Sequence, residues 1–450
     1  MSESFGLSRD AKAQLLARFA TRAPAAPQPE QPAEPTPELG RPDVAADLSM
    51  VRRAGDALGI RNPYFRAHEG VAGARTVIDG QEYDNFVSYN YLGLNGDSRV
   101  NRAAKDAIDR YGTSVSASRI VSGERPIHRE LEGKLARLYG KEDALALVSG
   151  HATNVTVIGH LVGRDDLILH DALSHNSIVQ GALASGARRI AFPHNDLDEL
   201  ERLLRDARGD AARVLIVAEG HYSMDGDVPD LARLVRIAKA NRASLMVDEA
   251  HSLGVLGARG YGIAEHCGVD PTEVDVWMGT LSKTLSGCGG YIAASASLID
   301  YLRCSAPGFV YSVGLPPPVA AAAIAALDIM EAEPWRVTRL QENSSRFLKA
   351  AQAHGLDTGP SIGAAIVPVM TGSSIVAARA ADRLFDRGIN VQPIIYPAVP
   401  EQAARLRFFL SELHEPEQLD RVAAEVAAAI AELRTMRVDL AELASRMAAR

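Results

Sequence analysis

The chain has 450 residues, 47% hydrophobic and 23% charged, which is the composition of a globular protein long enough for two or three domains. Its formal net charge of −8 gives no electrostatic reason to expect a nucleic-acid partner. Cys267, Cys288 and Cys304 form no CxxC pair, so we expect neither a disulfide framework nor a structural zinc site, and we predict a cytoplasmic protein. We also expect no secretory signal and no membrane span, because the chain lacks the apolar runs that these need.

The first predicted element is a short amphipathic helix over residues 7–21, with Leu7, Leu15 and Phe19 near one face. A proline-rich stretch over residues 24–42 follows and forms a stiff, extended tether. Two interpretations stay open for this tail, residues 1–45. It is either a disordered terminus or a docking helix for an acyl carrier or other partner protein.

From about Asp43 the chain alternates between helical and strand-like patterns. Short runs of apolar β-formers are separated by amphipathic segments such as 197–207 and 231–240. This alternation predicts a mostly parallel, seven-stranded sheet covered by helices on both faces. The runs occupy residues 144–148, 167–169, 189–192, 214–218, 245–247, 276–278 and 291–293.

The pattern changes at residues 316–318, which are three prolines. We expect a long helix after them, followed by a smaller C-terminal α+β domain. The predicted fold class is therefore α/β with a second, smaller α+β domain. Strands of that domain are predicted at 367–370, 389–395 and 406–410, and a closing helical region at 415–449. The predicted domains are an N-terminal segment over 46–105, a large domain over 106–320 and a small domain over 321–450.

Lys283 follows the run at 276–278, within the sequence Thr280-Leu281-Ser282-Lys283-Thr284. Burial at a strand end lowers the pKa of a lysine, and an unprotonated amine attacks an aldehyde to form a Schiff base. The hydroxyls of Thr280 and Ser282 suit a phosphate. By itself the tripeptide Ser-Lys-Thr is a weak signal, because most lysines are simply solvated.

Asp248 and His251 follow the run at 245–247. A carboxylate that keeps a pyridine nitrogen protonated makes pyridoxal phosphate (PLP) a strong electron sink. We therefore predict that Asp248 and Lys283 hold opposite ends of one PLP ring, with His251 near its phenolic oxygen. The alternative is a strand-end cap with a solvated imidazole. Asp-Glu-Ala-His also occurs in nucleotide-driven helicases, but the chain has no phosphate loop of the form G-x-x-x-x-G-K-[ST].

Two further strand ends carry small or aromatic polar residues. Ser149-Gly150-His151 is predicted to expose backbone N–H groups at a helix N-terminus, which suits a phosphate. His175 follows the run at 167–169, and an imidazole there can stack on a pyridine ring. For both histidines the alternative is a surface or satisfied core residue. No histidine spacing resembles a metal motif, so no metal site is expected.

Together these motifs resemble the α-oxoamine synthases, PLP enzymes of fold type I that include 8-amino-7-oxononanoate synthase and serine palmitoyltransferase. The resemblance extends from about residue 62 to 414. It rests on segments in family order: Ser-Tyr-Asn-Tyr-Leu-Gly-Leu at 88–94, Ser-Arg-Ile-Val-Ser-Gly at 118–123, His-Arg-Glu-Leu-Glu at 128–132, Glu-Gly-His-Tyr-Ser-Met-Asp-Gly-Asp at 219–227, and residues 247–254, 279–284 and 405–407.

The resemblance implies a role for each matching residue. Lys283 is then the Schiff-base lysine and the base that removes the α-proton, and Asp248 and His251 are the other catalytic residues. Arg407, favoured over Arg405, pairs with the carboxylate of the amino-acid substrate beside Asn90. The implied cofactor-binding residues are Gly150, His151, His175, Ser223, Asp248, His251, Thr280, Ser282, Lys283 and Ser312.

The resemblance also implies a homodimer with shared active sites, because Ser312 lies in the segment 309–316 that reaches the neighbouring subunit in this family. Two departures stand out. His151 replaces the usual Tyr or Phe, and the small residues at 112–119 replace a glycine-rich turn. We expect phosphate-side stacking at His151 and the mouth for the acyl chain to differ accordingly.

The implied reaction is a decarboxylative Claisen condensation of glycine, alanine or serine with an acyl thioester of coenzyme A or a carrier protein. Its products are an α-aminoketone, carbon dioxide and a free thiol. The tethered helix favours a carrier-protein donor. Alternatives are another fold-type-I enzyme, such as an aminotransferase or decarboxylase, and a non-catalytic partner subunit, in which Lys283 would be expected to be lost.

Overall fold

The computed structural model describes residues 10, 49, 53 and 55–434. Apart from residue 10, the predicted helix over 7–21 lies outside these residues, as does the end of the predicted helical region 415–449. Gly55 begins the larger of two compact units.

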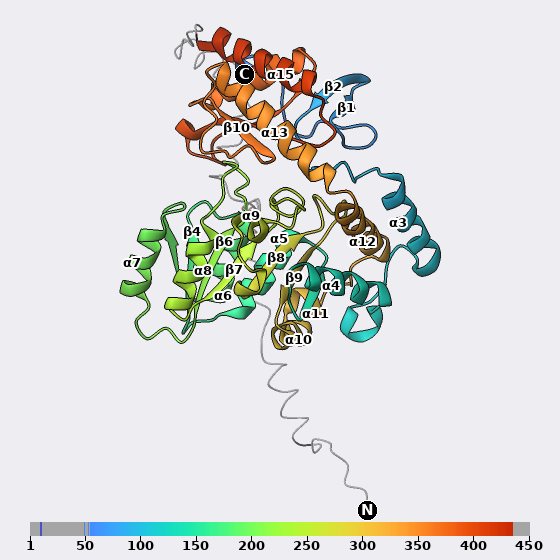
Figure 1. Cartoon of the computed structure of the whole chain (residues 1–450), viewed down its shortest axis with the longest axis vertical. Coiled ribbons are helices and arrows are strands. Elements are labelled where there is room, and N and C mark those ends of the chain that lie inside the picture. The colour runs from blue at the N-terminus through green and yellow to red at the C-terminus, as the bar shows by residue number, and fades with distance from the viewer. Residues whose placement is uncertain (1–9, 11–48, 50–52, 54, 435–450) are drawn as a thin grey trace, which may run out of the picture. The chain divides into compact units, whose positions relative to one another are not determined.

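A seven-stranded sheet with strand order β3-β9-β8-β7-β6-β4-β5 is the largest sheet among the described residues (Figure 1). Every predicted run from 144 to 293 is one of its strands, so the predicted sheet is confirmed. Strands β8, β7, β6, β4 and β5 run parallel, and β9 is antiparallel to both its neighbours. The strands are β3 (Asp143–Leu147), β4 (Leu167–Asp171), β5 (Arg188–Phe192), β6 (Val214–Glu219), β7 (Ser244–Asp248), β8 (Val276–Thr280) and β9 (Gly290–Ala294).

Apolar side chains alternate between two cores, one on each face of this sheet. In β6, Leu215 and Val217 join one core, whereas Ile216 and Ala218 join the other. A strand buried on both faces needs an apolar residue at every position, which explains the continuous apolar runs in the sequence. The covering helices are α4 (Pro126–Leu138), α5 (Gly150–Leu161), α6 (Asn176–Ser185), α7 (Leu197–Ala207), α8 (Leu231–Ala240), α10 (Ala296–Ser305), α11 (Pro307–Val310) and α12 (Pro317–Ala332).

Helices α7 and α8 begin and end where the sequence predicts. The Asp196 side chain caps α7 by accepting a hydrogen bond from the Glu199 N–H, a contact typically worth about 1 kcal/mol. Leu197, Leu200 and Leu204 form the buried face of α7. Capping and apolar spacing are both local signals, which is why these bounds follow from sequence alone.

Two small sheets accompany the helices α13 (Trp335–Ala353), α14 (Ser374–Asp386) and α15 (Pro416–Arg434). Their strands are β10 (Ile366–Met370), β12 (Gln392–Ile394) and β13 (Arg405–Phe409) in one, and β1 (Arg75–Ile78), β2 (Gln81–Asn85) and β11 (Ile389–Asn390) in the other. The strands predicted at 367–370 and 406–410 are confirmed, the one predicted at 389–395 is two short strands in different sheets, and β1 and β2 were not predicted. β2 pairs with β11, and Figure 1 shows β1 and β2 (blue) beside α13 and α15.

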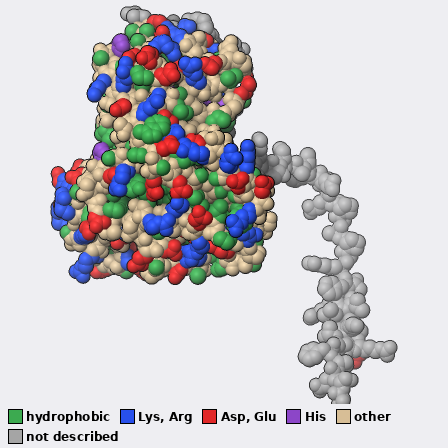
Figure 2. Space-filling view, turned by 45° about the vertical axis from the view of Figure 1, so that its right-hand side comes forward, with side chains coloured by type: hydrophobic (Ala, Val, Ile, Leu, Met, Phe, Trp, Pro, Cys, Tyr) green, Lys and Arg blue, Asp and Glu red, His purple; other side chains and the backbone are tan. Residues whose placement is uncertain are grey.

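The remaining helices are α3 (Ser98–Tyr111) and α9 (Ile263–Cys267). Among the described residues, no helix is both long and apolar enough to cross a bilayer. Acidic and basic side chains are intermixed over the face in Figure 2.

Candidate active site

The predicted site residues converge at one edge of the seven-stranded sheet. The parallel strands β4, β6, β7 and β8 end there, and carboxyl ends of parallel strands are the usual place for a ligand in such sheets. The side chains enclose a cavity of about 370 Å³. The predicted residues that line it are Gly150, His151, His175, Ser223, Asp248, His251, Thr280, Ser282, Lys283 and Arg407.

Lys283 lies on the tight loop between β8 and β9. The loop is closed by backbone hydrogen bonds from Leu281 N to Gly289 O (2.9 Å) and from Gly287 N to Leu281 O (2.8 Å). The Lys283 ammonium lies 5.6 Å from the centre of the Tyr89 ring. Burial lowers the pKa of Lys283 from 10.5 to about 8, against the opposing charge of Asp248. At pH 7 the amine is still mostly protonated, but its unprotonated fraction, about a tenth, is far larger than that of an ordinary lysine and grows to half near pH 8, which favours a role as nucleophile or base.

Asp248 is held at the end of β7 by two donors. Its Oδ2 accepts a hydrogen bond from Asn154 Nδ2 (2.7 Å), and its Oδ1 accepts one from the Ala250 N–H (2.9 Å). Asn154 also donates to Ser177 Oγ (3.0 Å), so α5 and α6 together orient the carboxylate. Asn154 was not predicted as a site residue. Its position one helical turn after Gly150 was the available signal.

Glu219 is a second buried carboxyl group that the sequence reasoning missed. It ends β6 directly beside Asp248 of β7, and its Oε1 accepts a hydrogen bond from the His175 N–H (2.5 Å). Burial, together with the neighbouring charge of Asp248, raises the pKa of Glu219 to about 8. Because Glu219 stays largely protonated at neutral pH, it adds little negative charge to the cavity. Its place at the end of a buried strand, like that of Asp248, was the signal that could have identified it.

His251 is buried, and its Nδ1 lies 2.7 Å from the Tyr91 hydroxyl. Burial lowers the pKa of His251, so the ring is neutral, and burial raises the pKa of Tyr91, so the phenol keeps its proton. The Tyr91 hydroxyl has no other hydrogen-bond partner in the part of the chain that the structure describes. If the Tyr91 oxygen instead accepted a hydrogen bond from an Nδ1–H of His251, the buried O–H of Tyr91 would lack an acceptor, at a cost of about 1–3 kcal/mol. Tyr91 therefore donates, and His251 carries its proton on Nε2.

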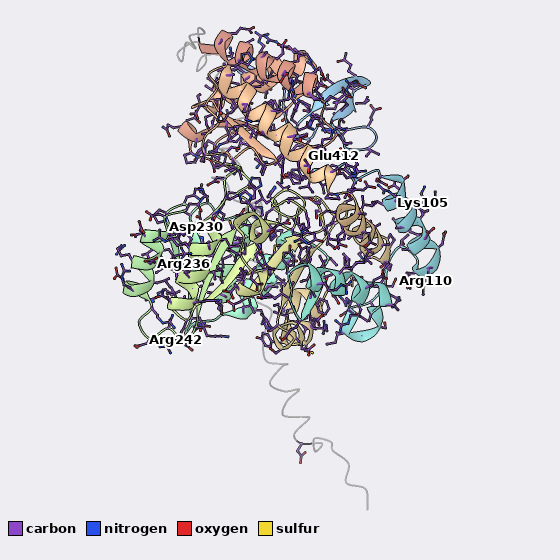
Figure 3. All side chains as sticks on the ribbon, viewed as in Figure 1. Lys105, Arg110, Asp230, Arg236, Arg242 and Glu412 are labelled. Atoms are coloured by element: carbon purple, nitrogen blue, oxygen red, sulfur yellow. The ribbon has the colours of Figure 1, made fainter. Side chains whose placement is uncertain are left out.

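The backbone around Tyr91 is braced from the C-terminal part of the chain. The N–H of Glu412, which is labelled in Figure 3, donates to Tyr91 O (2.9 Å). The Glu412 side chain accepts a hydrogen bond from Arg336 Nη1 (2.6 Å). This brace fixes the phenol relative to His251.

Tyr91→Phe is expected to lower kcat by about 10-fold, because His251 then loses the donor that keeps its proton on Nε2. The measurement is steady-state kinetics alongside the melting temperature. Tyr139→Phe is the matched control, since the buried hydroxyl of Tyr139 contacts the hydroxyl of Tyr291 (2.7 Å) instead of a cavity residue. Equal kcat values for the two variants would contradict the assignment.

Small residues shape the end of the cavity at the N-terminus of α5. A Cβ on Gly150 would lie 2.7 Å from Thr280 Oγ1, and one on Gly290 would lie 2.8 Å from the Gly150 Cα. The Thr280 hydroxyl donates to Gly289 O (2.9 Å), and the Ser282 hydroxyl lies 3.4 Å from the same oxygen. The rings of His151 and His175 meet edge to face, with centroids 6.2 Å apart. The first N–H groups of α5 could seat an anion, and the Thr280 and Ser282 hydroxyls could join them only by turning away from Gly289 O.

Arg405 and Arg407 differ in their hydrogen-bond partners. Arg405 Nη1 forms an ion pair with Asp225 Oδ1 (2.6 Å) and donates to Met224 O (2.9 Å). Arg407 Nη1 reaches only Ser223 O and Met224 Sδ, both at 3.1 Å. The buried Nε of Arg407 has no hydrogen-bond partner among the described residues. Arg407 therefore presents an uncompensated guanidinium to the cavity, and Arg405 does not.

Asn90 and Ser312 lie outside this cavity. Asn90 borders an adjoining cavity of about 410 Å³, which also touches Tyr89, Ser282 and Lys283. Its amide donates to the carbonyl groups of Ala72 (2.9 Å) and Asn95 (3.1 Å), so both amide hydrogens are used within the loop. Ser312 lies beside Arg119 and Gly314 instead. The predicted substrate contact of Asn90 and the predicted phosphate contact of Ser312 stay predictions.

Comparisons with known proteins agree with this geometry. The sequence model of the aminotransferase class I and II family matches residues 82–426. An 8-amino-7-oxononanoate synthase of Geobacter sulfurreducens is 42% identical over 386 residues, which cover 85% of this chain and 97% of the relative. One from Geotalea daltonii is 42% identical over 365 residues, which cover 81% and 92%.

Solved structures of serine palmitoyltransferases are also similar to this chain. A Sphingomonas wittichii serine palmitoyltransferase superposes with a TM-score of 0.82 and 30% identity, covering 87% of this chain and 98% of the other. A serine palmitoyltransferase from S. paucimobilis with bound PLP has a TM-score of 0.83 and 29% identity, covering 88% and 99%. This chain belongs to the α-oxoamine synthases.

As an α-oxoamine synthase, the chain is a PLP-dependent acyltransferase that condenses an amino acid with an acyl thioester and releases carbon dioxide. The residues of the cavity fit PLP. The helix N-terminus at Gly150 could bind a phosphate, the Asp248 carboxylate could pair with a protonated ring nitrogen, and Lys283 could supply the amine for the aldehyde. The predicted fold type and cofactor are thus confirmed.

The lowered pKa of Lys283 predicts the pH dependence of cofactor loading. Protonated lysine cannot attack an aldehyde, so the rate at which the apo-enzyme binds PLP covalently should rise with pH, with a midpoint near 8 instead of 10.5. Borohydride trapping at a series of pH values, followed by mass spectrometry, measures this rate. A midpoint near the ordinary lysine value would show that the amine is solvated.

Proposed function

We propose that Arg407 binds the carboxylate of glycine, alanine or serine next to Lys283, and that the side chains of this cavity then direct the condensation. The observation that carries the proposal is the half-buried Arg407 guanidinium, which lines the cavity, has a buried Nε without a hydrogen-bond partner and has no carboxylate partner among the described residues. A substrate carboxylate supplies the missing charge and acceptors, in the bidentate geometry that arginine favours.

Lys283, Asp248, His175 and the N-terminus of α5 would hold PLP. When bound, PLP withdraws electrons from the carbon next to the substrate nitrogen. Lys283 Nζ accepts the α-proton, which its low pKa permits. Arg407 orients the carboxylate relative to Lys283, and this positioning is the main contribution of the protein. The backbone carbonyl of Ser223 accepts a hydrogen bond from Arg407, and we assign the Ser223 side chain to the phenolic side of the ring together with His251.

The acyl thioester would approach from the adjoining cavity that Tyr89 and Lys283 share with the first. The Nε2–H of His251, set by Tyr91, is the donor we assign to the thioester oxygen as negative charge develops on it. A preorganised donor of this kind typically contributes about 10²- to 10³-fold in rate.

A substrate matrix tests this function. Glycine, alanine and serine are each combined with coenzyme A and carrier-protein thioesters, and thiol release and product mass are read. The relatives named for 8-amino-7-oxononanoate favour alanine as the first amino acid to test, and the structural neighbours favour serine. Amino-group transfer to a keto acid without thiol release would contradict the proposal in favour of an aminotransferase.

We further propose a homodimer with shared sites. Ile120, Val121, Tyr311 and Val313 are exposed apolar residues, with 81% of Val121 and 87% of Tyr311 accessible. The two segments that carry them are joined by hydrogen bonds from Ser118 Oγ to Val310 O (2.6 Å) and from Gly314 N to Ala117 O (3.1 Å). A second copy covering these residues would remove them from water.

Complementation between two inactive variants tests the dimer. Lys283→Ala and Ser312→Glu chains, inactive alone, should regain activity when coexpressed, because one site of the mixed dimer then has both native residues. No recovery despite mixed dimers would show that Ser312 serves its own chain.

We also place the protein in the cytoplasm, because three unpaired cysteines suit a reducing compartment.

The acyl donor would be a carrier-protein thioester, and the carrier protein would dock on the N-terminal region. Removing residues 1–42 should raise the KM for a carrier-bound acyl group and leave the KM for the coenzyme A ester unchanged. Equal KM values before and after the removal would exclude docking by that region.

A further inference from the structure

His194 lies between two carboxylates outside the cavity. Its Nδ1 is 2.8 Å from Asp171 Oδ1, and its Nε2 is 2.9 Å from Asp227 Oδ2. Asp171 ends β4, His194 follows β5, and Asp227 lies on the loop after β6. An imidazole can donate to two carboxylates only when both of its nitrogens carry protons.

The residues around His194 strengthen this bridge. Asn195 has a positive φ of 54°, and from that conformation its N–H donates to Asp171 Oδ2 (2.9 Å) and its Nδ2 to Asp227 Oδ2 (2.7 Å). The ring of Tyr222 packs edge to face on His194, with centroids 4.5 Å apart. These elements bring Asp171, Asp227 and Tyr222 against the imidazole as its titratable neighbours.

The other side of the Asp227 loop contacts the arginines of β13. Ser223 O accepts from Arg407, and Met224 O and Asp225 accept from Arg405. The Ile362 N–H also donates to Gly226 O (3.0 Å). The loop over residues 222–227 thus connects the strand ends of the large sheet with Arg407 on the small one.

We propose that His194 is a positioning residue for amino-acid binding: its bridge between Asp171 and Asp227 holds the 222–227 loop, and the loop sets the place of Arg407 relative to Lys283. The inference rests on the proposed role of Arg407. His194 itself does not border the cavity that Arg407 and Lys283 share.

The charge on His194 follows from the same contacts. Burial alone would lower its pKa, but the hydrogen bonds to Asp171 and Asp227 outweigh burial and raise the pKa from 6.5 to about 10. The protonated His194 therefore stabilises the folded state, fully below pH 6.5, and this contribution to the free energy of unfolding is lost as pH rises through about 10. The difference in melting temperature between native protein and His194→Ala should shrink over that range.

The test uses PLP-loaded enzyme and the variants His194→Ala, His194→Gln and Asp227→Asn. L-alanine and L-serine are titrated, and the change in absorption of the bound cofactor gives their Kd. Hydrogen exchange of residues 222–228 reports on the loop. His160→Ala is the matched control, because His160 lies 2.9 Å from Ser305 Oγ and stacks on Tyr301, away from the loop.

For His194→Ala we expect the amino-acid Kd to rise about 10- to 100-fold, the cost of a small misplacement of a binding group, with faster exchange of the loop and an unchanged KM for the thioester. His194→Gln, which keeps one N–H donor, should recover part of the affinity. A native Kd in His194→Ala and Asp227→Asn, with only a lower melting temperature, would overturn the inference. If the native enzyme itself gave no response to amino acids, the proposed role of Arg407 would fail instead.

Discussion

Replacing Lys283 with alanine is expected to lower kcat/KM by about 10⁴-fold, the largest effect of any single substitution in this chain. The variant loses the amine for cofactor attachment and the base for the α-proton at once. Thiol release with alanine and an acyl thioester measures the rate, and borohydride reduction followed by mass spectrometry shows whether PLP is attached. Added methylamine should restore a small part of the rate, because it supplies an external base.

Two further variants sharpen this result. Lys283→Arg keeps a positive charge but cannot attack an aldehyde, so it should be as inactive as Lys283→Ala. Lys141→Ala controls for loss of a partly buried lysine, because Lys141 donates to Thr272 O (3.0 Å), away from the cavity. Near-normal condensation by Lys283→Ala would refute the mechanism.

Replacing Arg407 with glutamine is expected to raise the amino-acid KM by about 100-fold, or about 2.7 kcal/mol of binding, the size of a charge-assisted hydrogen-bond pair. The cofactor spectrum and the KM for the thioester should not change. An amino-acid amide, which lacks the carboxylate, should bind equally poorly to the native enzyme and to Arg407→Gln. A preference of the native enzyme for the amide would argue against this pairing.

Arg405→Gln provides the contrast. It leaves the Asp225 carboxylate without its buried partner, a loss of about 3–5 kcal/mol of folding stability in comparable cases. The expected result is a lower melting temperature with a smaller change in amino-acid Kd than Arg407→Gln causes. The reverse pattern would assign the substrate carboxylate to Arg405.

Local patterns account for much of the fold that the sequence predicts. Residues 214–218 are apolar without interruption, which only a strand covered on both faces tolerates, and β6 is buried along its whole length. β1 and β2 form a hairpin around Asp79 and Gly80, whose φ values of 50° and 74° suit a two-residue turn, so the Asp-Gly pair was a local signal that the sequence reasoning missed. The pairing of β2 with β11, about 300 residues later in the chain, leaves no such local pattern.

Some residues of the candidate site were predicted from the sequence and others were not. Lys283, Asp248 and His251 were identified because each follows a recognisable strand, and their motifs match a family in order. Asn154, Glu219 and Tyr91 were missed as site residues. Asn154 and Glu219 had local signals, one helical turn after Gly150 and the end of a buried strand, but their partners Asp248 and His175 come from other segments. The contact of Tyr91 with His251 joins residues about 160 apart in the chain and has no signature in one sequence.

The sequence alone predicted the seven strands and the family, and it singled out Lys283 as the proposed cofactor-bearing lysine, because strand patterning and motif order are properties of contiguous residues. The folded chain distinguished Arg407 from Arg405, gave His251 its proton on Nε2 and revealed the bridge at His194. Each of these depends on which buried polar group finds a partner. Such partnerships are made by residues that meet only after the sheet has formed.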